Sequence, residues 1–334
     1  MSTSSGTKKL RAIFDRLRKR DTKEVFLLDG GTGEELIRRG VPDDRKIWSA
    51  TALVNPQYHD TLKDVHTSFL RAGSLAITTN SYGVVPGVGF SPQECKEYIA
   101  LSGKLGRESV DAEKRGFVFG SLGPLVESYR ADSIKQHEEG VKDYQIACDA
   151  LLPFVDAYLL ETASCVEESL QVMDAMRSTE SRKAVPLLVS FTLNNNGNTR
   201  DNKEILKSIQ EVLRESKEKE IELLGILFNC CKPEAISKAL EKIRADGDLT
   251  AALEETGVLL GVYANRLTDI DPTWTLADSQ ESQPFRTDLD EKQYWSFIQL
   301  WTERFGVKLV GGCCGITPVY IEHLKNELGK FALQ

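Results

Sequence analysis

The sequence predicts an α/β fold, a single-domain (β/α)8 TIM barrel, from three observations. Eight short apolar segments recur along the chain, and amphipathic segments with helical spacing separate them. Most of the apolar segments are continuous rather than alternating, which is typical of parallel strands buried on both faces. The rival fold is a doubly wound open sheet, but no GxGxxG follows the first apolar segment, where a dinucleotide-binding sheet would place it.

The predicted strands are VFLLD (25–29), LAITTN (75–80), FVFGS (117–121), AYLLE (157–161), PLLVSF (186–191), LLGILFN (223–229), VLLGVYAN (258–265) and KLVGG (308–312). Helical patterns lie between them, for example over 58–73, where Gly73 is expected to end the helix, and over 165–178. Two polar segments, 194–202 and 275–290, are predicted as loops. In a barrel both would lie at the rim that carries the chemistry.

Composition limits the class of protein. The chain has 334 residues, of which 41% are hydrophobic and 28% charged, as in an ordinary globular protein. Length alone would allow two domains, but barrels routinely exceed about 250 residues as one domain. We expect a helical extension over 1–23 and the barrel over 24–330. The net charge of -8 disfavours nucleic-acid binding, and the basic run RLRKR at 16–20 is predicted to be the solvated face of a helix.

The N-terminus, MSTSSGTKKLRAIF, lacks the apolar core of a signal peptide, and no stretch approaches a membrane span. We therefore expect a cytoplasmic protein with no membrane partner. In a reducing compartment, clustered cysteines are metal ligands or catalytic thiols before they are disulfides.

Barrel active sites lie at the C-terminal ends of the strands, and polar groups gather at those positions here. Four of the seven cysteines follow the sixth and eighth strands. The strand ends carry Asp29, Thr79, Glu161, Cys230, Cys231, Asn265, Cys313 and Cys314. The remaining cysteines, Cys95, Cys148 and Cys165, fall in helices or loops and are expected to be packing residues.

The adjacent pair Cys313 and Cys314 admits three interpretations: small buried side chains, a redox pair, or two ligands of one metal. Neighbouring cysteines rarely form a disulfide with each other, because the geometry is strained. Thiolate ligands in tetrahedral geometry indicate zinc, and three protein ligands would leave a fourth position open for substrate. Spacing alone leaves packing and redox chemistry open.

A series of sequence blocks resembles the homocysteine S-methyltransferase family. In chain order they are LLDGGTGEELIRRG, IWSA, VHTSFLRAGSLAITTNSY, GSLGP, LLET, SFT, LFNC and LVGGCCGITP. Any one block is weak, but the ordered set, with NC followed by GGCC, is highly specific. The resemblance covers about residues 24–328.

The resemblance implies a zinc-dependent barrel that transfers a methyl group to the thiol of homocysteine and forms methionine. It implies that Zn²⁺ is held by Cys230, Cys313 and Cys314, which are thereby the catalytic residues. It also implies that Asp29 and Glu161 bind the amino group of homocysteine, with Thr79 and Asn265 as further pocket positions. The partners would be homocysteine and a small methyl donor, and the protein would be a monomer or small homo-oligomer.

The implied chemistry is physically consistent. A free thiol has a pKa near ~8.5 and is mostly protonated at neutral pH, whereas zinc coordination deprotonates it. Two carboxylates suit the ammonium group of an amino acid. Methyl transfer to a thiolate needs no general base, and none of His59, His66, His137 and His323 lies at a predicted strand end. We expect all four to be surface or helix residues.

The chain departs from the family pattern in four places. The first block reads GGTGEEL where a GTEL ending is usual, and the segment after GSLGP lacks the usual glycine- and tyrosine-rich loop. The fourth and seventh strand ends read ETASC, without the common isoleucine-proline, and YANRLT, without the usual proline and serine-glycine pair. Because these loops are expected to contact the methyl donor, the departures leave the identity of the donor open.

We expect S-methylmethionine or S-adenosylmethionine as the donor. Betaine ranks below them, because the chain is shorter than betaine enzymes and shows no oligomerising C-terminal extension. A barrel that acts on another thiol or selenol acceptor, and a non-catalytic zinc- or thiol-binding protein, remain alternatives.

Some of the residues singled out also have simpler interpretations. Asp29, followed by two glycines, would suit a turn, and Glu161 would suit the start of a helix. Cys231 competes with Cys230 as a ligand, although the NC block favours Cys230. Trp48 and Trp274 are either walls for a cationic donor or core residues.

Overall fold

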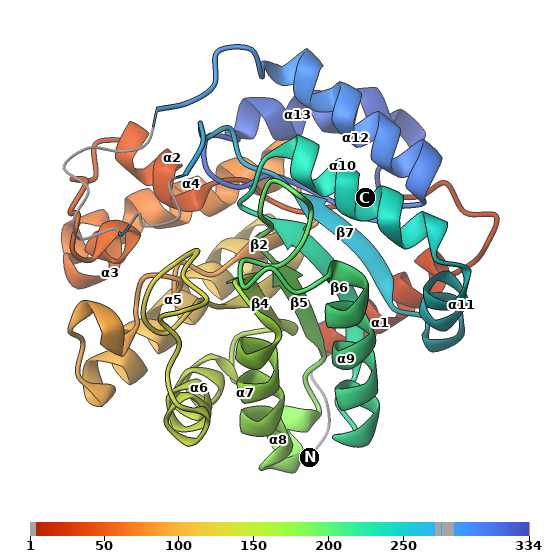
Figure 1. Ribbon diagram of the computed structural model, residues 1–334. Coiled ribbons are helices and arrows are strands. Elements are labelled where there is room, and N and C mark those ends of the chain that lie inside the picture. Colours follow the sequence, from red (N-terminus) through yellow and green to blue (C-terminus); the bar gives the residue numbers. More distant parts are fainter. Residues whose placement is uncertain (1–4, 271–274, 276–283, 334) are drawn as a thin grey trace.

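A computed structural model describes residues 5–270, 275 and 284–333, and its centre is a sheet of eight parallel strands (Figure 1). The strands pair in the order β1-β8-β7-β6-β5-β4-β3-β2, as a (β/α)8 barrel requires. They are β1 (Phe26–Leu27), β2 (Ala76–Thr78), β3 (Phe117–Leu122), β4 (Ala157–Ala163), β5 (Leu187–Phe191), β6 (Leu223–Asn229), β7 (Leu259–Tyr263) and β8 (Leu309–Val310). The predicted single-domain barrel is confirmed. Trp274 and residues 276–283 of the predicted loop 275–290 lie outside the described residues.

Two regions of hydrogen bonding complete the barrel wall around β1. On one side, bonds to the eighth strand continue beyond the short β8, because Leu28 N donates to Val310 O (2.7 Å) and Gly312 N donates to Asp29 O (2.9 Å). On the other side no regular ladder joins β1 to β2 among the described residues. Leu75 N instead donates to Leu27 O at 2.7 Å, so the sheet closes on itself through isolated bonds.

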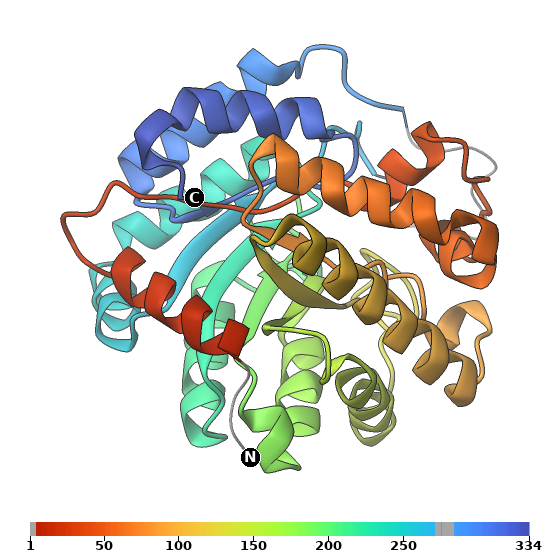
Figure 2. The same ribbon diagram turned by 180° about the vertical axis from the view of Figure 1, so that it is seen from behind.

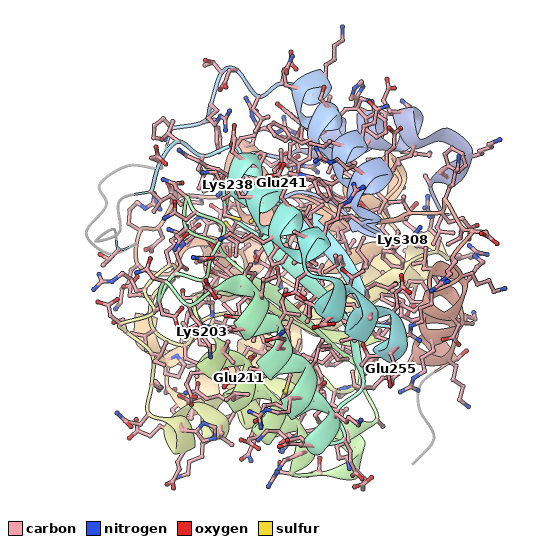
Figure 3. All side chains as sticks on the ribbon, turned by 45° about the vertical axis from the view of Figure 1, so that its right-hand side comes forward. Lys203, Glu211, Lys238, Glu241, Glu255 and Lys308 are labelled. Carbon is pink, nitrogen blue, oxygen red and sulfur yellow. The ribbon has the colours of Figure 1, made fainter. Side chains whose placement is uncertain are left out.

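Helices cover the outside of the sheet, and their charged side chains project outward, as Lys238 and Glu241 do in Figure 3. Gly73 ends α4 with a φ of +124°, as predicted. The helices are α1 (Ser5–Leu17), α2 (Thr32–Arg38), α3 (Thr51–Val54), α4 (His59–Ala72), α5 (Pro92–Glu113), α6 (His137–Leu151), α7 (Val166–Arg177), α8 (Glu180–Lys183), α9 (Ile205–Glu218), α10 (Pro233–Ala245), α11 (Gly247–Thr256), α12 (Glu291–Phe305) and α13 (Pro318–Leu328). Single 3₁₀ turns add η1 (Trp48–Ala50), η2 (Pro56–Tyr58), η3 (Pro86–Val88) and η4 (Gly329–Phe331). Within the part of the chain that the structure describes, no helix combines the length and apolar character needed to cross a bilayer.

Helix α1 closes the N-terminal end of the barrel. Its side chains Leu10, Phe14 and Leu17 are buried in one cluster with residues that point into the barrel. The ring of Phe14 lies 5.8 Å from that of Phe26, which stacks on Phe119 at 5.9 Å. Figure 2 shows α1, in red, lying across the strands on this side. The helix falls within the predicted extension 1–23, whose boundary at residue 24 stays a prediction.

The basic run at 16–20 was predicted as the solvated face of a helix, but α1 ends at Leu17, which is buried, so most of the run follows the helix. Its arginines form surface ion pairs. Arg16 pairs with Glu24 and Arg20 pairs with Glu254, each at 2.7 Å. At the opposite end of the barrel, the polar segment 194–202 is a loop after β5, as predicted, and the ammonium of Lys242 anchors it by donating to Asn196 O (2.8 Å).

Candidate active site

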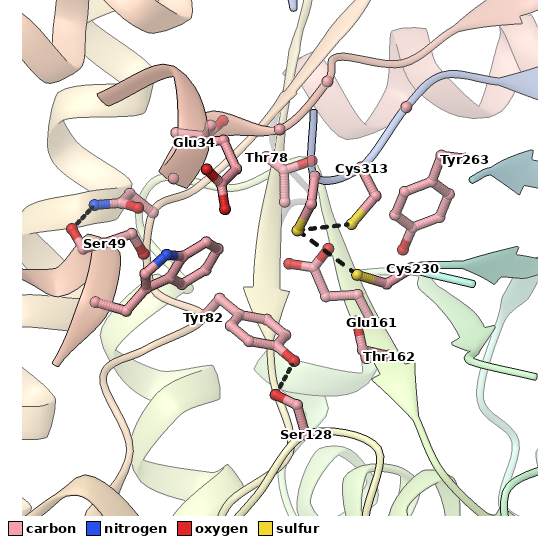
Figure 4. A pocket seen from close by; sticks show the side chains of 18 of the residues that line it. Glu34, Ser49, Thr78, Tyr82, Ser128, Glu161, Thr162, Cys230, Tyr263 and Cys313 are labelled. Carbon is pink, nitrogen blue, oxygen red and sulfur yellow. Dashed lines mark hydrogen bonds between the residues drawn. The ribbon is translucent and has the colours of Figure 1, made fainter. Parts of the chain in front are cut away.

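A cavity opens at the C-terminal ends of the strands, where the sequence analysis placed the chemistry. Figure 4 shows side chains from several strands converging on it. Its lining includes six of the seven predicted site residues: Asp29, Thr79, Glu161, Cys230, Cys313 and Cys314. The seventh, Asn265, is buried beside the cavity and contacts one of the cysteines. None of the four histidines, all of them described residues, is part of the lining.

Asp29 links β1 to β2 at the cavity floor. Its carboxylate, 5% exposed, accepts hydrogen bonds from Thr78 N (2.6 Å) and Thr78 Oγ1 (3.0 Å). The aspartate therefore does more than begin a turn, because it bridges the seam where the ladder is missing. The sequence analysis selected Thr79 and missed Thr78. The Thr79 hydroxyl instead bonds to Ser81 Oγ (2.8 Å) and to Ser121 N (2.9 Å).

A β-bulge brings Glu161 to the cavity. The pairing of β4 with β5 shifts register between Leu160 and Ala163, and Thr162 has a φ of +61°. A bulge of this kind redirects the side chains beside it. Ser121 Oγ donates a hydrogen bond to the Glu161 carboxylate. This contact gives Glu161 a place in the cavity wall and not at a helix start.

Asn229, at the end of β6 and two strands away from β4, holds the bulge in place. Its side-chain oxygen accepts from Thr162 N (2.9 Å) and Ser190 Oγ (2.7 Å), while its nitrogen donates to Thr162 Oγ1 (2.9 Å). The next residue, Cys230, has a φ of +46°, a strained conformation for a non-glycine residue. The NC pair thus fixes both the bulge that carries Glu161 and the sulfur of Cys230.

Backbone contacts hold the loop of Cys313 and Cys314. Cys313 N donates to Ala264 O (2.9 Å), and Arg266 N donates to Cys314 O (2.9 Å). Gly315 follows with a φ of +81°, which favours glycine. A Cβ on Gly31 would lie 2.7 Å from Cys313 O. The DGG block of strand one is therefore glycine-rich because the cysteine loop packs directly against it.

Three sulfurs meet at one point. The Sγ atoms of Cys230, Cys313 and Cys314 lie within 4.8 Å of one another. Cys314 Sγ is 3.8 Å from Cys230 Sγ and 4.0 Å from Cys313 Sγ. Cys231 is buried outside this group, and burial raises the pKa of its thiol to about 12. The structure thus joins the cysteines of strands six and eight into one group that would hold a metal ion.

Two side chains besides the clustered cysteines contact the sulfur of Cys230. The Tyr129 hydroxyl lies 3.0 Å from Cys230 Sγ, and Asn265 Nδ2 donates to the same sulfur at 3.7 Å. The guanidinium carbon of Arg200 lies 5.0 Å from the centre of the Tyr129 ring. Tyr129 was not among the predicted site residues. Its position in the rim loop after β3 is the signal that would have drawn attention to it.

The cavity carries strong electrostatic perturbations. Burial raises the pKa of Asp29 to about 7, although bonds from Thr78 oppose the shift. Burial raises the pKa of Glu161 to about 8, and Ser121 opposes it. Hydrogen bonds from the Cys313 and Cys314 thiols hold the pKa of Cys230 well below its usual range. Its hydrogen bonds and negative charge in turn raise the pKa of the other two thiols. Such a site favours cations, since a positive ligand would stabilise the charged forms of the carboxylates and thiols whose pKa is raised.

Several hydroxyl groups in the cavity wall lack a partner. Within the described residues, Thr32 Oγ1, Ser49 Oγ and Tyr263 Oη are buried without a hydrogen-bond partner, and all three residues line the cavity. Buried polar groups are nearly always satisfied in native proteins. Their orphaned state indicates that the cavity is built around a polar ligand.

The other cysteines and the histidines play no part in this site. Cys95 and Cys148 are buried in α5 and α6, and Cys165 is buried just before α7, as expected for packing residues. His66 is buried in α4, with both ring nitrogens unpaired among the described residues.

Comparison with known proteins agrees with this geometry. A family model described as homocysteine S-methyltransferase matches residues 26–328. The chain is 25% identical to the homocysteine S-methyltransferase YbgG of Bacillus subtilis, with 91% of this chain and 94% of the relative covered. It is 27% identical to the homocysteine S-methyltransferase of Escherichia coli, with 95% and 97% covered.

A solved structure shares the fold. The homocysteine methyltransferase MmuM from Escherichia coli, in its metallated form, superposes with a TM-score of 0.71 at 24% identity, covering 95% of this chain and 99% of that one. The family model spans most of the barrel, from β1 to the last helix. The chain therefore belongs to the homocysteine S-methyltransferase family and is a methyltransferase enzyme.

Proposed function

We propose that this enzyme transfers a methyl group from S-methylmethionine or S-adenosylmethionine to homocysteine, forming methionine, at a zinc ion held by Cys230, Cys313 and Cys314. The observation that carries the proposal is the meeting of these three sulfurs in one cavity with the carboxylates of Asp29 and Glu161.

The sulfur positions fit zinc. A tetrahedral ion with Zn–S distances near 2.3 Å separates its sulfur ligands by about 3.8 Å. The sulfurs of Cys314 and Cys230 lie 3.8 Å apart, and those of Cys314 and Cys313 lie 4.0 Å apart. Zinc bound there would supply the Lewis acidity that keeps the thiol of homocysteine deprotonated near neutral pH.

Asp29 and Glu161 are proposed to bind the ammonium group of homocysteine. Both side chains line the cavity, and both have their pKa raised by burial, to about 7 and about 8. An ammonium group would favour the charged carboxylates and form charge-assisted hydrogen bonds with them. Fixing the amino end of the substrate leaves its sulfur free to approach the cysteines. Thr79 and Asn265 are retained as further pocket positions. Thr78 donates to Asp29, and Asn265 donates to the sulfur of Cys230.

The transfer itself needs little from the protein beyond alignment. A lone pair of the homocysteine sulfur forms the new bond to the methyl carbon. The bond from that carbon to the donor sulfonium breaks, and its electron pair stays on the donor sulfur, which becomes a neutral thioether. The thiol proton leaves to solvent. The cavity walls hold donor and acceptor in line.

Further properties belong to the same proposal. All seven cysteines are free thiols, which supports a reducing, cytoplasmic setting. We retain the expectation of a monomer or small homo-oligomer, with the barrel over 24–330 and the extension over 1–23.

The test is a donor panel. The zinc-loaded protein is incubated with homocysteine and, in turn, S-methylmethionine, S-adenosylmethionine and betaine, and methionine is measured. We expect methionine with at least one sulfonium donor. Cys314→Ala should lose both zinc and activity, while the matched Cys231→Ala should keep both.

Several results would redirect the proposal. If methionine formed only with betaine, betaine would be the donor in place of the two sulfonium compounds. If transfer occurred only to another thiol or a selenol, that compound would be the acceptor in place of homocysteine. Zinc binding with no transfer to any acceptor would make the chain a binding protein. Full zinc content in Cys314→Ala would refute the metal site.

A further inference from the structure

The cavity contains one more carboxylate than homocysteine requires. Among the described residues that line it, the carboxylates are Asp29, Glu34 and Glu161, and Arg45 is the only arginine or lysine. The proposed function uses Asp29 and Glu161. Glu34 has no role in it, although an acidic group at this position must influence any charged ligand.

Glu34 has no direct partner among the described residues, although the charge of Arg45 favours its ionised form. It lies in the first turn of α2, directly after β1, and forms no hydrogen bond or ion pair with any described residue. The nearby guanidinium of Arg45 pairs with Asp43 (3.3 Å). Figure 4 shows Glu34 and Tyr82 on one side of the cavity and Cys230 and Cys313 on the other. Glu34 therefore adds negative charge across the cavity from the thiols.

Two aromatic side chains line the cavity with Glu34. The rings of Trp48 and Tyr82 meet edge to face with centres 6.1 Å apart. Trp48 has a φ of +44°, a strained conformation that typically marks a functional position. A Cβ on Gly33 would lie 2.5 Å from the indole ring, so only glycine lets the indole lie this close to α2. Aromatic faces attract cations.

Unpaired hydroxyl groups lie in the same region. Ser49, next to Trp48, is 3% exposed and lines the cavity, and its Oγ has no partner among the described residues. Thr32, two residues before Glu34, also has an Oγ1 that is unpaired within the described part of the chain. A ligand with polar groups as well as a cationic centre would satisfy them.

We infer that Glu34, with Trp48 and Tyr82, binds the cationic end of the methyl donor and so selects a net-positive sulfonium amino acid over betaine. The inference deepens the proposed function and rests on it. S-Methylmethionine and S-adenosylmethionine carry an ammonium and a sulfonium against one carboxylate. Betaine carries one cation and one carboxylate, and its cation has no N–H to donate. Glu34 attracts the first class and repels the carboxylate of the second.

The acidity of Glu34 agrees with this role. Burial, together with the charge of Asp43, raises the pKa of Glu34 to about 7. A cationic ligand favours the charged carboxylate and would reverse that shift. The bound donor thus supplies a positive charge that stabilises the ionised carboxylate of Glu34.

The kinetic consequence is specific. The positive charge on the donor sulfur disappears during transfer, whereas the charge on its ammonium group persists. An interaction with a persistent charge stabilises the bound donor and the transition state alike, and therefore affects KM without lowering kcat. An interaction with the sulfonium would stabilise only the bound donor, which also leaves kcat undiminished.

The test uses Glu34→Gln in the zinc-loaded enzyme at saturating homocysteine. We expect the KM of the sulfonium donor to rise about tenfold or more, as for a lost charge-assisted hydrogen bond, with kcat not reduced and the KM of homocysteine unchanged. Glu34→Asp, which keeps the charge, should restore part of the affinity. Glu241→Gln, on the outer face of α10, is the matched control and should match the wild type.

A binding titration makes the inference independent of turnover. S-Methylmethionine is titrated without homocysteine while tryptophan fluorescence is followed, and its Kd should rise about tenfold in Glu34→Gln. Equal Kd values for the two proteins overturn the inference, as does a variant that raises the KM of homocysteine instead. If the wild type forms no methionine from any donor, the proposed function fails, and the titration alone decides the role of Glu34.

Discussion

The two ends of the barrel use the same strands but bury opposite kinds of side chain. At the N-terminal end, Phe26 of β1 is 0% exposed and packs among rings beneath α1. Three residues later, at the C-terminal end, Asp29 is 5% exposed among thiols and another carboxylate. Rings need only one another as partners. Carboxylates and thiolates that are buried in their charged forms need a cation as partner, and the described residues of the cavity include few cationic side chains.

The difference shows that the N-terminal end of the barrel contributes mainly to stability and the C-terminal end mainly to function. The N-terminal end contributes burial that requires no ligand. The C-terminal end holds buried polar groups whose cost is relieved only when metal and substrate bind. Changes at the first end should therefore alter folding alone. Changes at the second should alter function, and some should make the ligand-free protein more stable.

Phe14→Ala is the largest expected change and tests the N-terminal end. Removing a fully buried ring leaves a cavity under the barrel and should lower the free energy of unfolding by about 3–5 kcal/mol. Chemical denaturation measures this loss, and the surviving folded enzyme should keep its kcat and KM. A marked change in KM would show that the two ends are coupled.

Asn229→Ala tests whether the two ends really differ, because this residue of the C-terminal end is expected to be structural as well as functional. It would remove three hydrogen bonds to Thr162 and Ser190 and leave the buried amide of Thr162 unpaired. We expect a loss of about 2–4 kcal/mol in the free energy of unfolding, accompanied by a higher KM for homocysteine because the bulge beneath Glu161 relaxes. A stability loss with unchanged KM would make Asn229 purely structural.

Asp29→Asn, at the C-terminal end, should have the opposite effect on stability: it should stabilise the metal-free protein. Burial raises the folded-state pKa of Asp29 from 3.8 to about 7. The folded protein thus keeps a proton that the unfolded chain releases, and stability from this group is lost as pH rises from 3.8 to 7. The variant escapes that loss and should gain about 1–3 kcal/mol at pH ~8.

Thermal or denaturant unfolding across the pH range measures this gain. It should shrink as pH falls toward ~4, and homocysteine binding should be severely weakened at every pH. A variant less stable than the wild type at high pH would show that Asp29 is not a buried carboxyl with a raised pKa.

Much of the fold is predictable from the sequence because its signals are local. Continuous apolar runs and intervening helical patterns locate all eight strands, and Gly73 marks the end of α4. The lengths of β1 and β8 were less predictable. Both strands are followed by the glycine-rich contact between Gly31 and Cys313, which depends on two segments meeting in space.

The site was partly predictable for a similar reason. The rule that barrel chemistry lies at strand ends places Asp29, Glu161 and the three clustered cysteines in one region from their positions in the chain alone. Tyr129 was not predictable, because its contact with Cys230 depends on a loop path.

Two local details of the site also could not be predicted from the sequence. The bulge at Thr162 was not predictable, because its cause lies on β6, in the side chain of Asn229. Thr78, which lines the cavity together with Thr79, was not selected, because the pleat decides which side chain meets Asp29.

The central claim is that three cysteine sulfurs hold zinc and leave one position for the sulfur of homocysteine. X-ray absorption at the zinc edge tests it most directly. The zinc-loaded enzyme should show three sulfur ligands at about 2.3 Å and one lighter ligand, changing to four sulfur ligands when homocysteine is added. Fewer than three sulfurs before addition, or a spectrum that homocysteine leaves unchanged, would contradict the account.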